Sequence, residues 1–197
     1  MPKNFLRYFI ILNLAALPVV FLAGQKITVM RQATEEKALP VYGALRSFSL
    51  TDSEGIEFNQ DSLKGKVWLA NFMFTTCPNA CPTMNLKISL LQDSLAQEIR
   101  FVSFSVDPQK DTSSVLKGYA KKFNAKPGVW FFLTGEKSVI AQLLEDCHFA
   151  KAEDPLMHGL KLVLLDEKGS VRGYYDYSDE NIVKKLARDI KLLKEKG

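Results

Sequence analysis

One apolar run constrains the fold of this chain more than any other feature. Residues 67–74 read VWLANFMF and lie between Gly65 and a loop that contains two cysteines. A nearly continuous apolar run of this length is typical of a strand that is buried on both faces of a sheet. We therefore expect these residues to form a central strand that other elements cover on both sides.

The remainder of the globular part alternates between strand and helix patterns. Apolar runs predict further strands at 101–106, 129–133, 160–165 and 173–175, and the DSEG tetrapeptide at 52–55 predicts a hairpin turn. Helical spacing predicts four helices, whose apolar faces are Met84, Ile88, Leu91 and Leu95; Val115, Leu116, Tyr119 and Phe123; Ile140, Leu143, Leu144 and Cys147; and Ile182, Leu186, Ile190 and Leu193. This order predicts an α/β fold of the thioredoxin-like type, a central mixed sheet flanked by helices.

The N-terminal segment predicts a membrane anchor. Residues 8–24 are 17 residues without a charge, and a helix of that length spans roughly 26 Å, slightly less than a hydrocarbon core of about 30 Å. A cleaved signal peptide is the alternative, but Phe21 and Leu22 stand where a cleavage site needs small residues. We expect an anchor or signal segment at 1–27, a linker at 28–40 and the thioredoxin-like domain at 41–197.

The distribution of charge bears on location and partners. Lys3, Arg7 and Lys26 precede residue 28 without any acidic residue, and the other residues hold 23 basic and 22 acidic side chains. A nearly neutral domain gives no reason to expect nucleic-acid binding. A single N-terminal span most simply places the domain outside the cytoplasm, on the periplasmic side of the inner membrane if the source is bacterial.

Two cysteines follow the central strand. Cys77 and Cys81 occur in the segment FTTCPNACPTM, where the strand pattern changes to a helix pattern. The N-terminus of a helix favours thiolates, which are the nucleophilic and metal-binding form of cysteine. If residues 77–81 form a helical turn, the two Cβ atoms lie about 5–6 Å apart. Such a pair can bind one soft metal ion or form a disulfide.

The cysteine spacing leaves three interpretations open. A structural disulfide would close a small ring, which constrains the unfolded chain little, so a redox-active dithiol or a metal site is the better use of the pair. Two thiolates are too few ligands for zinc but suit Cu(I). His158, just before the strand predicted at 160–165, is a candidate third ligand, and an ordinary loop histidine is the alternative.

Three segments together resemble the SCO/SenC family of membrane-tethered, thioredoxin-fold proteins of cytochrome c oxidase assembly. They are MFTTCPNACP at 73–82, VSFSVDPQKDT at 102–112 and HGLKLVLLDEKGSVRGYY at 158–175. The resemblance covers about residues 41–195 and implies that Cys77, Cys81 and His158 bind one copper ion. It also implies delivery of copper, or of reducing equivalents, to the dicopper centre on a cytochrome c oxidase subunit, with other copper chaperones or thiol reductants as partners.

The chain departs from the family pattern beside the histidine. The family usually has Asp before it and Ser or Thr after it, whereas this chain has Met157 and Gly159. The missing carboxylate is expected to alter the orientation of the imidazole or to weaken binding of Cu(II).

Three further residues, Asp107, Cys147 and His148, are candidates for a role in the site. Asp107 either approaches the cysteine loop or only begins the turn at 108–111. Cys147 lies on an apolar helical face, which predicts a buried structural thiol. His148 follows it directly, but neighbouring side chains on a helix point about 100° apart, so a shared metal ion is not expected.

Two enzyme classes compete with copper delivery. In a membrane-anchored thiol–disulfide oxidoreductase, Cys77 or Cys81 would attack a disulfide of an extracytoplasmic protein, and no histidine is needed. A thiol peroxidase would set the attacking cysteine beside a threonine and an arginine. Thr75 and Thr76 are close in sequence, but the nearest downstream arginine is Arg100.

Overall fold

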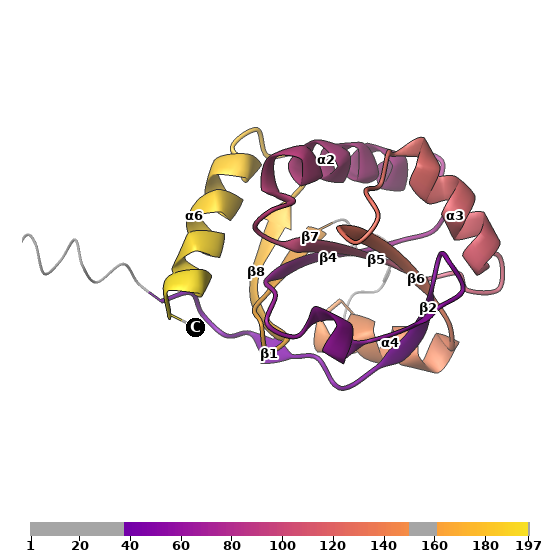
Figure 1. Cartoon of the computed structure of the whole chain (residues 1–197), viewed down its shortest axis with the longest axis horizontal. Helices are drawn as coiled ribbons and strands as arrows, with labels where there is room; N and C mark the ends of the chain where they lie inside the picture. The colour runs from indigo at the N-terminus through magenta and orange to yellow at the C-terminus, as the bar shows by residue number, and fades with distance from the viewer. Residues whose placement is uncertain (1–37, 150–160, 197) are drawn as a thin grey trace, which may run out of the picture. The chain divides into compact units, whose positions relative to one another are not determined.

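One mixed sheet of eight strands forms the centre of residues 38–149 and 161–196, the parts of the chain that this computed structural model describes (Figure 1). The strand order is β1-β8-β7-β4-β5-β6-β2-β3. The strands are β1 (Gly43–Ala44), β2 (Ser49–Asp52), β3 (Glu57–Asn59), β4 (Trp68–Met73), β5 (Arg100–Ser105), β6 (Trp130–Thr134), β7 (Lys161–Leu165) and β8 (Ser170–Asp176).

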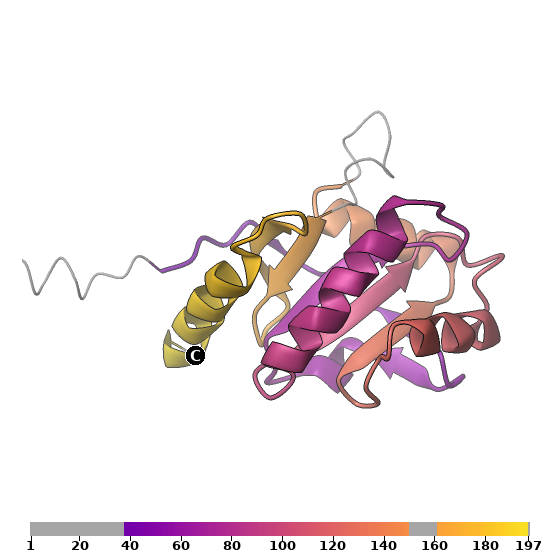
Figure 2. The same cartoon turned by 90° about the horizontal axis from the view of Figure 1, so that it is seen from above.

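Helices cover both faces of the sheet, as the sequence predicts (Figures 1 and 2). The helices are η1 (Gln60–Leu63), a 3-10 turn, and α2 (Ala80–Leu95), α3 (Ser113–Lys122), α4 (Lys137–Asp146) and α6 (Ile182–Lys196). One apolar core lies between the sheet and α2, α3 and α6, and a second lies between the sheet and α4. The curled sheet therefore separates two cores.

The central strand β4 is buried over its whole length. It pairs in parallel with β5 on one edge and antiparallel with β7 on the other. The expectation from the apolar run is confirmed, because a strand with covered faces and two neighbours has no solvent-facing side. The cysteine loop follows its carboxyl end directly.

The predicted helices are present, with one difference in packing. The four apolar residues predicted for α2 are all buried, and so are those predicted for α6. In α3, Val115 is 42% exposed, whereas Leu116 and Tyr119 pack into the core. Val115 therefore lies outside the buried face of α3, and the helix buries a narrower apolar stripe than expected.

The predicted N-terminal anchor at 1–27 lies outside the described residues. Within residues 38–149 and 161–196, no helix has the length and apolar character needed to cross a bilayer. The compact domain starts at Leu39.

Phe104 of β5 provides a test of the core on the α4 side. Its ring is fully buried and contacts three others, with ring centroids 5.8 Å from Phe48, 6.4 Å from Trp68 and 5.3 Å from Phe72. We expect Phe104→Ala to lower the free energy of unfolding by about 3–5 kcal/mol, because it leaves a cavity among these rings. Urea unfolding of the full chain measures the effect, with the exposed Val183→Ala as control; a loss below about 1 kcal/mol would contradict this packing.

Candidate dithiol site

Cys77 and Cys81 lie in the connection from β4 to α2. The Cys77 N–H donates to the carbonyl of Phe74 at 3.2 Å, and α2 begins only at Ala80. The helical turn considered for residues 77–81 is therefore not formed: Cys77 precedes the helix and Cys81 lies in its first turn. Pro78 gives the reason, because a residue before proline is disfavoured in helical conformation.

The Cys77 sulfur lies at the N-terminus of α2. The Cys81 N–H, which has no acceptor within the helix, donates to Cys77 Sγ at 3.4 Å. In the described part of the chain, the side chain of the capping residue Asn79 makes no capping hydrogen bond. The sulfur thus accepts the hydrogen bond that an N-cap oxygen usually takes.

The two thiols differ in their readiness to ionise. Partial burial opposes ionisation of Cys77, but the N–H groups of Cys81, Asn79 and Ala80 and the Cys81 thiol outweigh it and lower the pKa of Cys77. Burial raises the pKa of Cys81 to about 12, and the nearby Cys77 and Asp111 add to the rise. Cys77 therefore ionises more readily than Cys81, whose thiol hydrogen-bonds to the Cys77 sulfur.

Asp111, rather than Asp107, reaches the cysteine loop. It is fully buried, and its carboxylate accepts from the Thr75 N–H at 3.0 Å, the Thr75 hydroxyl and the Ser105 hydroxyl at 2.6 Å. The carboxylate of Asp107 instead pairs with Lys110 at 3.3 Å, and its carbonyl accepts two N–H groups of the turn. Only the turn alternative for Asp107 is thus supported. Asp111 lies in the same segment, VSFSVDPQKDT, but its role depends on the turn and is not visible in the sequence pattern.

A buried polar network holds α2 on the sheet one turn after Cys81. Asn85 accepts from Asn71 of β4 and donates to the Tyr119 hydroxyl of α3, each at 3.2 Å. Ser103 donates to Asn71 at 2.6 Å and accepts from the Trp130 indole at 2.9 Å. Burial raises the pKa of Tyr119 to about 12, so it remains a neutral hydroxyl near the thiols. The sequence analysis did not identify this network, because its residues are scattered over five elements.

Cys147 and His148 take no part in the dithiol site. Cys147 is 1% exposed in the core on the α4 side, and burial raises the pKa of its thiol to about 12, which confirms the predicted buried structural thiol. His148 has φ 58° and ends α4 where glycine is usual, with the Phe149 N–H bonded to the Leu144 carbonyl at 2.8 Å. Its ring Nε2 lies 2.9 Å from the Tyr42 carbonyl oxygen.

The third predicted ligand, His158, lies outside the described residues, together with Met157 and Gly159. Among residues 38–149 and 161–196, no cluster of three or more His, Cys, Asp or Glu side chains is arranged to hold a metal ion.

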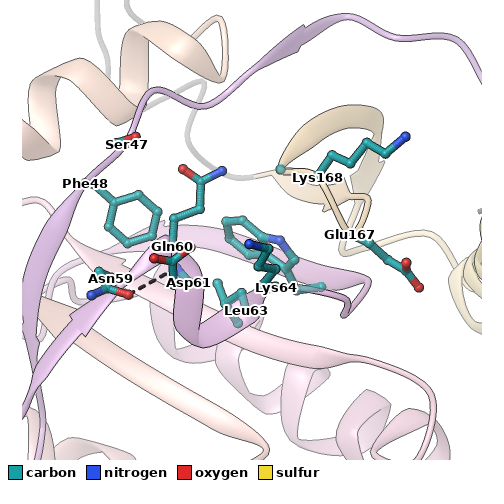
Figure 3. A pocket seen from close by; sticks show the side chains of 11 residues that line it. Ser47, Phe48, Asn59, Gln60, Asp61, Leu63, Lys64, Glu167 and Lys168 are labelled. Carbon is teal, nitrogen blue, oxygen red and sulfur yellow. Dashed lines mark hydrogen bonds between the residues drawn. The ribbon is translucent and has the colours of Figure 1, made fainter.

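A cavity lies at the opposite end of β4 from the cysteines. Trp68, at the start of β4, is one of the residues that line a cavity of about 330 Å³, surrounded by Phe48, the turn from Asn59 to Lys64, and Glu167 and Lys168 (Figure 3). Arg100 pairs with Trp68 at this end, whereas Met73 leads to the cysteines. The arginine considered for a peroxidase thus lies at the wrong end of the strand.

Comparison with known proteins identifies the family. The family model described as SCO1/SenC matches residues 38–194. This chain belongs to the SCO1/SenC family. The match includes the cysteine loop, β7, β8 and most of α6.

Solved structures of Sco proteins are similar to this chain. A SCO1/SenC family lipoprotein from Bacillus anthracis is 34% identical with a TM-score of 0.70, over 79% of this chain and 97% of the other. BsSco, described with a disulfide switch and as a member of a family of cytochrome c oxidase assembly proteins, is 30% identical with a TM-score of 0.69, over 80% and 98%. Yeast Sco1 with copper bound is 26% identical with a TM-score of 0.62, over 77% and 94%.

The difference between the thiols can be measured in the reduced, metal-free chain. We expect iodoacetamide at neutral pH to modify Cys77 at least about tenfold faster than Cys81 or Cys147, because a lowered pKa leaves more of the reactive thiolate. The rate at Cys77 should fall as the pH drops through its lowered pKa, since protonation removes the nucleophile. Mass spectrometry of timed samples gives the site of modification. Faster modification of Cys81 would contradict the assignment.

Proposed function

We propose that this SCO1/SenC protein binds one copper ion through Cys77, Cys81 and His158 and acts in cytochrome c oxidase assembly. It delivers copper, reducing equivalents or both to the dicopper centre of the oxidase. The observation that carries the proposal is the pair of sulfurs at the start of α2, one already favoured as thiolate. Two thiolates and an imidazole are a donor set that suits Cu(I).

The sheet register supports His158 as the third ligand. β7 runs antiparallel to β4, with Trp68 opposite Leu165 and Ala70 opposite Val163. β7 therefore begins beside the carboxyl end of β4, the end that leads to Cys77. His158 stands three residues before Lys161 in the sequence, and three residues of chain span at most about 10 Å, which supports it as the third ligand.

Relatives support copper and the oxidase as the context. Copper is bound in the structure of yeast Sco1, and BsSco is described among cytochrome c oxidase assembly proteins. Transfer would proceed by ligand exchange, in which thiols of the acceptor replace the ligands of this chain one at a time. The raised pKa of Cys81 implies that copper displaces its proton on binding and that the proton returns on release.

The proposed location is the membrane surface. The uncharged segment at 8–24 would hold the chain in the bilayer with the domain outside the cytoplasm. The similar Bacillus anthracis protein is described as a lipoprotein, a different means of membrane attachment. Copper chaperones or thiol reductants of the same compartment would load the dithiol.

Copper binding tests the three proposed ligands. We expect the full chain to bind one Cu(I), Cys77→Ala and Cys81→Ala to lose it in competition with a chelator, and His158→Ala to weaken binding by about tenfold, or about 1.4 kcal/mol. Cys147→Ala is the matched control and should bind as wild type. Unchanged Cu(I) binding after both Cys77 and Cys81 are replaced would refute the proposal.

Thiol–disulfide exchange is a second candidate function, favoured by the difference between the two thiols. The Cys77 thiolate would attack a partner disulfide, forming a mixed disulfide and releasing one partner thiolate. Cys81 would then attack the Cys77 sulfur, releasing the second partner thiol and closing the Cys77–Cys81 disulfide. Two electrons pass to the partner. The similar protein BsSco is described with a disulfide switch, which supports a redox-active cysteine pair.

Trapping separates this candidate from copper delivery. If exchange is the function, Cys81→Ser should accumulate a mixed disulfide through Cys77, whereas Cys77→Ser should accumulate little, because buried Cys81 ionises poorly. Non-reducing electrophoresis of the full chain, incubated with a disulfide-containing oxidase peptide, measures the adduct. A mixed disulfide trapped in Cys81→Ser, together with a wild-type chain that has no Cu(I) affinity, would favour the enzyme, and the absence of an adduct with Cys81→Ser would count against it.

A further inference from the structure

We propose that Asp111 is a positioning residue, which holds the cysteine loop so that Cys77 and Cys81 act as one unit. The inference rests on the proposed function of the pair as a dithiol. Asp111 itself touches neither copper nor a substrate in this proposal. It acts through Thr75, two residues before Cys77.

The contacts of Asp111 join three segments at one point. The Thr75 N–H and hydroxyl belong to the loop after β4, and the Ser105 hydroxyl belongs to the last residue of β5. Thr112, the next residue, caps α3 by accepting from the Val115 N–H. The carboxylate therefore ties the cysteine loop to the end of the neighbouring strand and to the start of α3.

The charge makes this connection rigid. Asp111 has no exposed surface, and among the ion pairs of the described residues none includes it. Within the described part of the chain, its carboxylate accepts from one N–H and two O–H donors, and hydrogen bonds to a charged group are stronger than those between neutral groups. Moving Thr75 away would leave a buried carboxylate with one donor, so the loop is strongly held in place.

A fixed loop has a chemical consequence for the dithiol. The Cys77 N–H is bonded to Phe74, directly before Thr75, and the Cys77 sulfur is bonded to the Cys81 N–H. Holding Thr75 thus restricts the range over which the Cys77 sulfur moves relative to Cys81. Restriction of this kind raises the effective concentration of one thiol for the other and favours the disulfide.

Equilibrium with glutathione measures this effect without copper. One protein dithiol and one oxidised glutathione give one protein disulfide and two reduced glutathiones. We expect Asp111→Asn to lower this equilibrium constant about tenfold, a rise in reduction potential of about 30 mV. Alkylation of the quenched full chain followed by mass spectrometry gives the fraction of Cys77–Cys81 disulfide.

Variants of Thr75 separate position from charge. Asp111→Asn also removes a negative charge, whereas Thr75→Val keeps the charge and removes the hydroxyl donor. For Thr75→Val we expect the equilibrium constant with glutathione to fall about threefold. Thr75→Ser keeps the hydroxyl and should remain within about twofold of wild type. Asp189→Asn is the control for a buried carboxylate elsewhere: Asp189 is 4% exposed in α6 and accepts from Tyr175 at 2.6 Å. It should leave the equilibrium unchanged.

Each contrary outcome overturns the inference. It fails if the equilibrium constants of Asp111→Asn and Thr75→Val both stay within about twofold of wild type. It also fails if Asp111→Asn changes the constant and Thr75→Val does not, or if Asp189→Asn changes it as much as Asp111→Asn. If Asp111→Asn does not fold, Thr75→Val against Thr75→Ser still decides. Failure here, with wild-type copper binding intact, leaves the proposed function standing; failure of copper binding leaves this measurement unaffected.

Discussion

Complete burial of β4 is the constraint on which the rest of the structure depends. With both faces covered and both edges paired, the strand has no freedom to shift its register, because a shift would break the pairing with β5 and with β7 together. Its carboxyl end is thus a fixed point, and the loop that leaves it carries Cys77. The antiparallel pairing with β7 places the start of β7 beside this carboxyl end of β4.

The pKa values of the two thiols differ because backbone N–H groups surround one sulfur and burial affects the other more strongly. The partly exposed Cys77 sulfur accepts N–H groups at the helix N-terminus, whereas Cys81, in the first turn of the helix, is buried in the core near Asp111. The pKa of Cys77 is lowered and that of Cys81 is raised, so Cys77 ionises more readily than Cys81. Copper delivery and thiol exchange both use this asymmetry, which is why one site supports both proposals.

Polar groups in the core hold the site in place. Asp111 fixes the loop before α2, and Asn85 fixes the helix itself to β4 and to Tyr119. Buried polar groups of this kind stabilise a unique arrangement only when all their hydrogen bonds are made. Among the described residues, Thr134 Oγ1 on β6 is the buried side-chain nitrogen or oxygen atom without a hydrogen-bond partner, and it belongs to neither set.

The amino-acid sequence was enough to predict the central strand, the four long helices and the reactive pair, but not β1 or η1. Apolar runs and helical spacing depend on residues close in the chain, so β4, α2 and α6 could be predicted, as could burial of Cys147. The cysteine motif and two further segments were enough to indicate the family. Tertiary structure alone decided which carboxylate reaches the loop, since Asp107 and Asp111 lie in the same short segment and differ only in where the turn directs them. It also decided that Cys77 precedes the helix and which thiol ionises first, because burial and N–H groups from several residues set those properties together.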